Sequence, residues 1–457
     1  MWLGLARIAG DVASCLSSRA FVLKNERRVE GGRVSVLVAE RIVRVGLLGF
    51  GQVGQAVAAL AGERRAALRA AGLDVRMAGA LVRDRDKART GPAVRLHHDA
   101  ATLLGGRCDV VVDVMGGEQP AFDLVRQAME AGAHVVSANK TLIAARGLEL
   151  STVAARHGVA FVFDAAVIAG VPFLGALSRR PLVASPSRIV GIINGTSNFI
   201  ACRIARGEPF AAALAAAQAR GYAEPDSAAD ISGRDAAEKL TILLHLTGHR
   251  HVSVHDLTTA SLEWVTSADV LGARALGAVI KPIALAGLDA DNPGAWVGPA
   301  CVDRRHALAA QDGVSNAIEF IGADGDPVVF SGPGAGPRVT AATILDDVVE
   351  AVRGGDRVFA PGPASALAAS SLRVPPAGRW YLRASGGRVN PRDVADAIAA
   401  SGLVTRSLIR CGPAVVATTG TGPWTAVTTF LEALRDAGTS ALALPIIEPR
   451  QSSSSSN

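Results

Sequence analysis

The residues best suited to chemistry lie in the stretch GYAEPDSAADISGRDAAEKL, at residues 221–240. Its penultimate residue is Lys239, and four carboxylates come before the Gly233-Arg234 pair or just after it: Glu224, Asp226, Asp230 and Asp235. Lysine is rare in this chain, because only five of the 47 lysine and arginine residues are lysines. Burial lowers the pKa of an ammonium group, which can then exchange a proton, whereas a guanidinium stays charged. Lys239 is therefore a candidate for proton transfer.

The element that must hold Lys239 is a helix, which the pattern GRDAAEKLTILLHL predicts over residues 233–246. Asp235 and Lys239 are four residues apart and share one face of it. They form either a surface ion pair or a catalytic pair. Pro225 and Gly233 favour turns that gather the upstream carboxylates around one point. Such a pocket suits a ligand that carries an ammonium group.

Length and composition narrow the class of protein. At 457 residues the chain has room for two to four domains, and 49% hydrophobic with 19% charged residues is a globular composition. Charged residues, Gly or Pro interrupt every long apolar run, so we expect no membrane span. The net charge is +6, but the arginines are scattered and aromatic residues amount to 4%, so we expect no nucleic-acid partner. Five distant cysteines without a CxxC pair argue against disulfides and zinc and indicate a cytoplasmic protein.

A dinucleotide-binding unit is indicated near the start of the chain. A β-rich run at residues 43–48 precedes an apolar helical pattern, and between the two come Gly49, Phe50, Gly51, Gln52, Val53 and Gly54. In this setting the glycines allow a tight turn, close approach of the backbone to a pyrophosphate, and packing of helix on strand. The phosphates then lie at the helix N-terminus. The alternative is a glycine-rich turn without a ligand.

The next strand, expected at residues 75–82, bears on the choice between NADP and NAD. It is followed by Arg83 and Asp84. An arginine at this point favours the 2′-phosphate of NADP, and an acidic residue favours the 2′-hydroxyl of NAD. Because Arg83 comes first, we prefer NADP without excluding NAD.

Two later strands of this unit add groups at the carboxyl edge, where an open parallel sheet binds its ligand. A strand expected at residues 108–115 ends in Met115 and is followed by Gly116, and we assign both to the cofactor. A strand expected at residues 134–137 leads to Lys140, where cofactor and substrate should meet. The alternative for Lys140 is an ordinary exposed loop lysine.

Further junctions of strand and helix carry groups for a ligand. A strand that begins at Arg188 leads to Asn194, Gly195 and Thr196, which either bind a substrate or cap the following helix. A glycine-rich run that includes Gly336 opens a helix expected over residues 340–352, and it either returns to the dinucleotide or only reverses the chain. Four histidines between residues 245 and 255 lack a set of Cys or carboxylate partners, so we assign them to a helix C-terminus rather than to zinc.

The end of the chain predicts a separate small domain. Residues 354–376 are rich in Gly, Pro, Ala and Ser and indicate a linker. The last unit alternates as strand, helix, strand, strand, helix and strand, with helices expected at residues 391–401 and 423–437, which is a βαββαβ domain. The serine-rich tail, residues 451–457, is expected to be disordered. Residues 1–40 form an extension of unknown use.

Four motifs together resemble homoserine dehydrogenase. They are GFGQVG at residues 49–54, SANK at residues 137–140, NGTSNFI at residues 194–200, and the segment from Gly221 to Lys239, which is the family's most specific motif. The resemblance runs in one order from about residue 42 to residue 450. It implies an NAD(P)-dependent enzyme that interconverts L-homoserine and L-aspartate 4-semialdehyde, on the pathway to threonine, methionine and isoleucine.

The resemblance also implies roles for individual residues. Those that match Lys239 and Lys140 act on the substrate oxygen, and the one that matches Asp235 orients the catalytic lysine. The residues that match Glu224 and Asp230 hold the amino acid, and we also assign Asn194, Gly195 and Thr196 of the strand-helix junction to the substrate. A monovalent cation such as Na⁺ is expected near Asp164, Val167, Ala169 and Val171.

The resemblance gives an expected architecture of the α/β class. A Rossmann-type dinucleotide-binding domain spans residues 41–172, with residues 335–353 packing back on it, and an α+β substrate and dimerisation domain spans residues 173–334. Residues 377–450 form an ACT-like domain, and homodimers or homotetramers are expected. In the ACT-like domain the turn on which ligand binding relies is replaced by residues 386–391, Gly-Gly-Arg-Val-Asn-Pro, which leaves threonine inhibition open.

Two other functions stay open from the residues alone. One is another dehydrogenase of a small amino acid or semialdehyde with the same first domain. The other is a catalytically silent amino-acid sensor. Two lysines around a carbonyl site favour an enzyme, because a sensor needs neither of them.

Overall fold

The computed structural model describes residues 21–23, 27–29, 32–34, 39–84, 86–178, 186–249, 251–322, 327–334, 336–356, 367–387 and 389–449, with those before residue 40 described as backbone alone. The expected extension at 1–40 and linker at 354–376 therefore lie partly outside the described residues, and the tail at 451–457 lies wholly outside them. Two compact units make up the chain. One comprises residues 1–137, 152–162 and 344–356, and the other comprises residues 138–151, 163–343 and 357–457.

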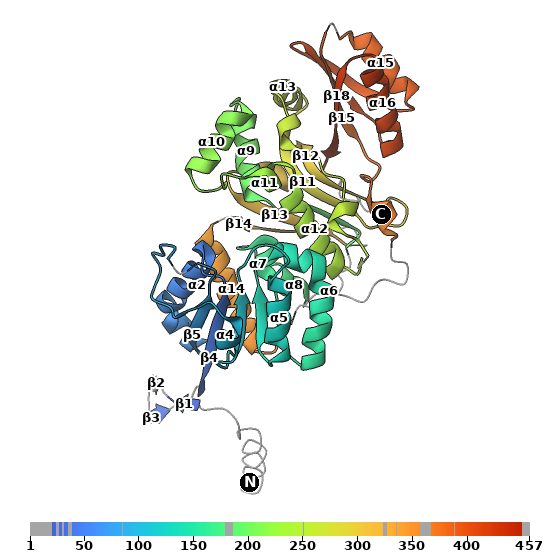
Figure 1. The fold of residues 1–457 in the computed structure, drawn as a ribbon. Coiled ribbons are helices and arrows are strands. Elements are labelled where there is room, and N and C mark those ends of the chain that lie inside the picture. The colour runs from blue at the N-terminus through green and yellow to red at the C-terminus, as the bar shows by residue number, and fades with distance from the viewer. Residues whose placement is uncertain are drawn as a thin grey trace. The chain divides into compact units, whose positions relative to one another are not determined.

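The first unit is built on a parallel sheet, drawn in blue to teal in Figure 1. Its strand order is β6 (Leu96–His97), β5 (Leu73–Leu81), β4 (Ala39–Leu48), β7 (Val110–Asp113), β8 (His134–Ser137) and β9 (Phe161–Val162). β1 (Phe21–Leu23) pairs antiparallel with β4, and β2 (Arg27–Val29) pairs with β3 (Gly32–Val34). Counted from β4 along the chain, the order is 3-2-1-4-5-6, that of a dinucleotide-binding sheet. The expected Rossmann-type fold is confirmed.

β7 is an apolar run up to Asp113, as is typical of a parallel strand covered on both faces. All residues of β7 are buried. The connecting helices are α2 (Gln52–Glu63), α3 (Arg65–Ala70), α4 (Ala100–Leu104), α5 (Ala121–Glu130) and α6 (Lys140–His157). α5 buries Phe122, Val125 and Met129, spaced by three and four residues, and this apolar stripe packs against β7 and β8.

A helix from late in the chain completes the first unit. α14 (Pro337–Val352) begins three residues earlier than expected, and its end, with the residues after it, groups with this unit. The Arg41 guanidinium donates to the Val352 carbonyl at 3.2 Å, and that of Arg353 donates to the Ala71 carbonyl at 2.9 Å. These bonds tie the end of α14 to β4 and to the turn after α3.

The second unit contains a nine-stranded sheet among its described residues. The strand order is β14 (Pro327–Pro333), β13 (Ser315–Ile321), β10 (Arg188–Ile192), β11 (Ala278–Gly287), β12 (Gly294–Asp303), β18 (Ser440–Ile447), β15 (Trp380–Ser385), β17 (Ala414–Thr419) and β16 (Thr405–Cys411). The helices before β15 are α7 (Asp164–Ile168), α8 (Leu174–Ser178), α9 (Gly195–Ala205), α10 (Phe210–Ala219), α11 (Ala228–Ile231), α12 (Arg234–Leu246) and α13 (Ser267–Ala275). Of these, α9 and α13 pack on β11.

The expected βαββαβ order at the end of the chain is confirmed. The elements are β15, α15 (Pro391–Ala400), β16, β17, α16 (Trp424–Asp436) and β18, and the two helices match their expected limits to within one residue. Figure 1 shows α15 and α16 beside the four strands. Their shared core includes Trp380, Phe430 and Leu382, all fully buried.

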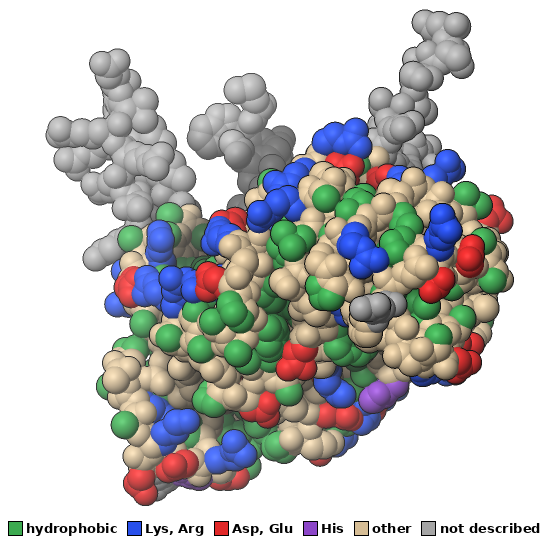
Figure 2. Space-filling model, turned by 90° about the horizontal axis from the view of Figure 1, so that it is seen from above, with side chains coloured by type: hydrophobic (Ala, Val, Ile, Leu, Met, Phe, Trp, Pro, Cys, Tyr) green, Lys and Arg blue, Asp and Glu red, His purple; other side chains and the backbone are tan. Residues whose placement is uncertain are grey.

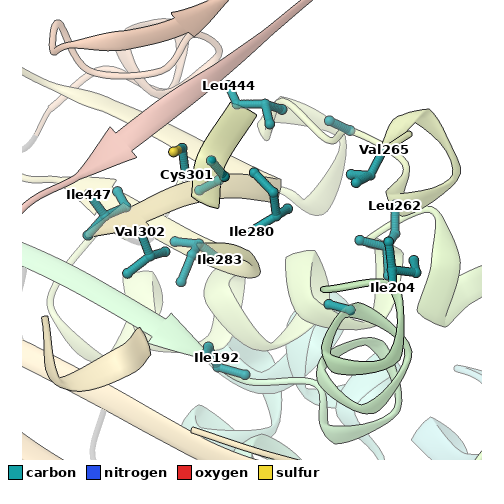
Figure 3. Packing of buried hydrophobic residues seen from close by; sticks show 14 of the residues in the cluster. Ile192, Ile204, Leu262, Val265, Ile280, Ile283, Cys301, Val302, Leu444 and Ile447 are labelled. Atoms are coloured by element: carbon teal, nitrogen blue, oxygen red, sulfur yellow. The ribbon is translucent and has the colours of Figure 1, made fainter. Parts of the chain in front are cut away.

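The terminal βαββαβ segment is continuous with the rest of the second unit. β18 pairs in parallel with β12, Cys301 opposite Ile446 and Val302 opposite Ile447. The apolar side chains near this seam form one cluster, in which Leu444 and Ile447 lie with Ile280, Ile283, Cys301 and Val302 (Figure 3). One sheet and one core therefore run through both segments.

A buried polar cluster reinforces this seam. Asp269 on α13 is fully buried and forms an ion pair with the Arg383 guanidinium on β15. The Tyr381 hydroxyl donates to the other oxygen of Asp269 at 3.1 Å. Burial, followed by the charge of Asp269, raises the pKa of Tyr381, so this hydroxyl stays a donor. Arg383 also donates to the Thr266 hydroxyl at 2.9 Å.

Charge is mixed on the molecular surface. On the face seen in Figure 2, Lys and Arg side chains are interspersed with Asp and Glu. Positive charge is thus spread over this face much as arginine is spread along the sequence.

The Arg383–Asp269 pair leads to a stability prediction. Arg383→Met leaves the buried Asp269 carboxylate without its cation, and we expect the free energy of unfolding to fall by about 3–5 kcal/mol. The control is Arg206→Met, because Arg206 pairs with Asp312 on the surface and such pairs contribute about 0–1 kcal/mol. Denaturant unfolding followed by tryptophan fluorescence measures both. Equal small losses in the two variants would contradict the prediction.

Candidate active site

Asp235 lies at the centre of the candidate site in the second unit. It is in the first turn of α12 and is buried. Its Oδ2 lies 2.8 Å from the Lys239 Nζ, and its Oδ1 lies 3.2 Å from the Lys140 Nζ. The expected i, i+4 pair is confirmed as a contact, and a second lysine from α6 shares the same carboxylate.

Asn194 connects this ion cluster to Asp230. Its amide nitrogen donates to Asp235 Oδ2 at 2.8 Å and to Asp230 Oδ1 at 2.7 Å. Its amide oxygen accepts from the Ser197 N–H at 2.8 Å and caps α9. Of the two alternatives for this residue, the helix cap is confirmed, and the same side chain contacts both carboxylates of the cluster.

The charges in this cluster reinforce one another. Burial disfavours ionised Asp235, but the two lysines outweigh it and lower the pKa of Asp235 to about 2. Burial acts to lower the pKa of Lys140, but the Asp235 carboxylate raises it above its ordinary value. Burial raises the pKa of Asp230, against the opposing hydrogen bond from Asn194. At neutral pH the centre of the site is therefore an ionised carboxylate with a charged Lys140.

Both ammonium groups remain within reach of a ligand. The side chain of Lys239 is 15% exposed and that of Lys140 is 35% exposed. The Lys239 Nζ also donates to the Ile193 carbonyl at 3.0 Å, so two of its three hydrogens have fixed partners.

The other expected substrate residues lie at different depths. Gly195 and Thr196 are in the first turn of α9, where the Thr196 hydroxyl donates to the Tyr222 carbonyl at 2.6 Å. Glu224 is exposed, and no described contact joins its carboxylate to Asp230 or Asp235. The carboxylates of residues 221–240 therefore do not all lie together. Asn194 binds Asp230 and Asp235, whereas Glu224 lies at the surface.

A small cavity lies beside Asn194 and Asp230. It has a volume of about 20 Å³ and is walled mostly by apolar groups of α12, β11 and β12. A space of this size holds a single water molecule.

The glycine-rich loop of the first unit has the geometry that its spacing indicates. Gly49 has φ of +101°, and it ends β4 in a turn that a side chain would strain. A Cβ on Gly54 would lie 2.7 Å from the Gly49 carbonyl oxygen, so only glycine allows this close approach of α2 to the strand. Gly51 precedes α2, with Phe50 beside it and Gln52 and Val53 in the first turn. The α2 N-terminus thus offers its amides to an anion.

The residues after β5 form a basic loop. Arg83, which we assigned to the ribose of the cofactor, is exposed. Sequence reasoning missed Arg89, whose guanidinium donates to the carbonyls of Asp84 at 2.6 Å, Lys87 at 2.9 Å and Phe50 at 3.4 Å. Arg89 ties this loop to the glycine-rich turn. The only signal for it in the sequence is a further arginine in the same segment.

The carboxyl ends of β7 and β8 are held together by Asp113. Its buried carboxylate accepts from the Met115 N–H at 3.0 Å and from the Ser137 hydroxyl at 2.9 Å. Met115 and Gly116 therefore follow a fixed strand end. Gly336 belongs to the second unit, has φ of +119°, and accepts the N–H groups of Val339 and Thr340 at the start of α14.

The residues of the expected cation site lie around α7. Asp164 begins this helix, and the preceding strand β9 stops at Val162. Val167 is in the helix, Ala169 leaves it with extended backbone (φ −56°, ψ 140°), and Val171 follows. The last carbonyls of a helix have no amide partners within it. Of the expected donors, the Val171 carbonyl accepts from the Phe173 N–H at 2.8 Å.

Comparison with known proteins identifies the family. A family model described as "Homoserine dehydrogenase, NAD binding domain" matches residues 49–164, and one described as "Homoserine dehydrogenase" matches residues 172–349. The homoserine dehydrogenase of Synechocystis sp. is 36% identical over 321 residues, which is 68% of this chain and 73% of that protein. The chain belongs to the homoserine dehydrogenase family. The resemblance in its motifs is confirmed.

Solved structures of the family extend the likeness along the chain. The homoserine dehydrogenase of Thiobacillus denitrificans is 30% identical with a TM-score of 0.78, and the match covers 90% of this chain and 99% of that one. The enzyme of S. aureus, solved at pH 8.5, is 27% identical with a TM-score of 0.71 and coverage of 89% and 99%.

Membership of the homoserine dehydrogenase family decides between the open functions. The chain is an NAD(P)-dependent oxidoreductase with a nicotinamide cofactor and a small-molecule substrate. The silent sensor is thereby set aside. Among the described helices, none combines the length and the hydropathy that crossing a membrane requires.

Proposed function

We propose that the chain interconverts L-homoserine and L-aspartate 4-semialdehyde by hydride transfer with lysine-assisted proton transfer. The observation that carries the proposal is the placement of two ammonium groups, Lys239 and Lys140, on the one buried carboxylate of Asp235. The oxygen of an aldehyde gains negative charge as the carbonyl carbon accepts a hydride. Cations that are already held in place stabilise that charge. Family membership supplies the substrate pair.

The proposed step divides the work between cofactor and protein. The nicotinamide, when bound, supplies or accepts the hydride at the carbon. In the reducing direction an ammonium group gives a proton to the developing alkoxide, and in the oxidising direction the neutral amine takes the proton of the hydroxyl. Lys239, the more buried of the two lysines, is our choice for this proton transfer, with Lys140 polarising the same oxygen. Asp235 orients both.

The amino-acid end of the substrate is assigned to the acidic side of the site. Asp230 is held by Asn194 next to the ion cluster, and its carboxylate suits the α-ammonium of homoserine. Glu224 is exposed upstream of it and would add a second carboxylate as the substrate enters. Gly195 and Thr196 supply the fixed first turn of α9 beside them.

For the cofactor we propose NADP in preference to NAD. The proposal is supported by Arg83, which is exposed directly after β5, and by Arg89, which binds that loop to the Phe50 carbonyl of the glycine-rich turn. The pyrophosphate is assigned to Gly49–Gly54 and the α2 N-terminus, with Met115, Gly116, Lys140 and Gly336 as further contacts.

The remaining proposals concern a bound cation, the terminal segment, the oligomeric state and the pathway. A monovalent cation would be held by Asp164 and the carbonyls of Val167, Ala169 and Val171. The terminal βαββαβ segment is proposed as an ACT-like domain on the basis of its element order. A cytoplasmic homodimer or homotetramer that serves threonine, methionine and isoleucine synthesis completes the proposal.

The role of Lys239 is tested by substitution. We expect Lys239→Ala to lower kcat for NADPH oxidation with aspartate semialdehyde by at least about 100-fold, the range of general acid catalysis, while the Kd for NADPH stays unchanged. Lys239→Arg should also be slow, because a guanidinium keeps its proton. Turnover of Lys239→Ala within about threefold of the unchanged chain would exclude this lysine as the proton donor.

Cofactor preference is tested at Arg83. A hydrogen bond to a charged group is worth about 1.5–3 kcal/mol, so Arg83→Ala should raise KM for NADP by about 10-fold or more and leave KM for NAD nearly unchanged. Arg156→Ala is the control, since Arg156 is exposed in the last turn of α6. If Arg83→Ala raises both KM values equally, Arg83 does not recognise the 2′-phosphate.

A further inference from the structure

A second acidic residue of α12 faces α6 beside the ion cluster. Glu238 is buried and lies three residues after Asp235 and one before Lys239, so Asp235, Glu238 and Lys239 occupy one side of the helix. The sequence pattern gives it no role, because a Glu in a helix is most often a solvated surface residue.

The Glu238 carboxylate has two described partners. Its Oε2 accepts from the Thr141 hydroxyl at 3.1 Å, and its Oε1 lies 3.6 Å from the Arg234 Nε. Thr141 is the second residue of α6 and follows Lys140 directly. Two successive side chains of α6 are thus bound by two carboxylates of α12 that are one turn apart.

The first turn of α6 is held both by its own preceding residue and by the carboxylates of α12. Asn139 precedes the helix, and its side-chain oxygen accepts from the Leu142 N–H at 3.2 Å. A carboxylate near a helix N-terminus is favoured by the helix dipole, which reduces the cost of burying Glu238. Removal of Glu238 or of the Thr141 hydroxyl would free the turn that carries Lys140.

We propose that Glu238 is a positioning residue, which by accepting the Thr141 hydroxyl holds the first turn of α6 so that the Lys140 ammonium stays on Asp235. The catalytic consequence rests on the proposed function, in which Lys140 polarises the substrate oxygen. The structural part stands on the contacts alone. Thr141 connects Glu238 to Lys140, because its hydroxyl donates to Glu238 and it follows Lys140 in the chain.

The negative charge of Glu238 adds an electrostatic effect on Lys140. Burial acts to lower the pKa of Lys140, while Asp235 and then Glu238 and Asp230 raise it. The other charged groups that face this cluster are Lys239, paired with Asp235, and Arg234, paired with Glu238. Hydrogen bonding and charge can therefore be separated by substitution.

Substitutions at Thr141 and at Glu238 separate the effect of the hydrogen bond from the effect of the charge. Thr141→Val removes the hydroxyl and keeps the Glu238 charge, so kcat should fall by about 10-fold to 100-fold, as misplacement of a group in the site does. Thr141→Ser keeps the hydroxyl and should retain nearly full kcat. Glu238→Gln keeps an acceptor for Thr141 and removes the charge. The Lys140 ammonium should then titrate at lower pH, which trace acylation with mass spectrometry measures for each lysine.

The control is Glu149→Gln, because Glu149 lies on the exposed side of α6, paired with Arg146. It should leave both kcat and the titration of Lys140 unchanged. The proposal is overturned if Thr141→Val turns over as fast as Thr141→Ser, or if Lys140 has the same acylation midpoint in these two variants. An equal midpoint in Glu238→Gln and Glu149→Gln would overturn the electrostatic effect of Glu238.

The acylation experiment separates this proposal from the proposed function. It reports on Lys140 without any turnover, so a midpoint that is lower in Thr141→Val than in Thr141→Ser, in a chain that does not oxidise homoserine, would refute the activity and keep the positioning role. Normal homoserine oxidation with equal midpoints in these two variants would keep the activity and refute the positioning role of Glu238.

Discussion

A single buried carboxylate that holds two ammonium groups is the constraint on which the candidate site depends. Two lysines close together repel each other, and a carboxylate without partners is costly to bury. Asp235 resolves both conflicts, because each of its oxygens pairs with one lysine and one of them also accepts from Asn194. The low pKa of Asp235, about 2, follows from that arrangement. Any element that carries one of these side chains must therefore meet the others at this point.

The fold meets this requirement by bringing helix N-termini together. Lys140 is the first residue of α6, Asn194 caps α9, and Asp235 is in the first turn of α12. The positive ends of the helix dipoles thus surround the carboxylates of Asp235 and Asp230. Behind them, β10 leads directly to Asn194, and the nine-stranded sheet and its core extend to the terminal domain (Figure 3). Charged groups are placed by rigid elements rather than by loops.

Local sequence patterns predicted many of the elements and the short-range pair of the site. They predicted none of the contacts between residues that are distant in sequence. The i, i+4 spacing predicted the Asp235–Lys239 pair, and apolar periodicity predicted the limits of α15 and α16. Both are local properties of the sequence. The bond from Thr141 to Glu238 joins residues 97 apart in sequence, and no periodicity encodes such a contact. The acidic stretch was expected to converge, yet Glu224 is exposed. Pairing of β12 with β18 was missed because backbone hydrogen bonds between strands leave no side-chain signature.

The central claim is that Asp235 holds both lysines in their working positions, and turnover by Asp235→Asn tests it most directly. Asparagine keeps the size of the side chain and removes its charge, so both ammonium groups lose their common partner. The account predicts that kcat for NADPH oxidation with aspartate semialdehyde falls by at least about 100-fold while NADPH still binds. Turnover within about threefold of the unchanged chain would contradict it.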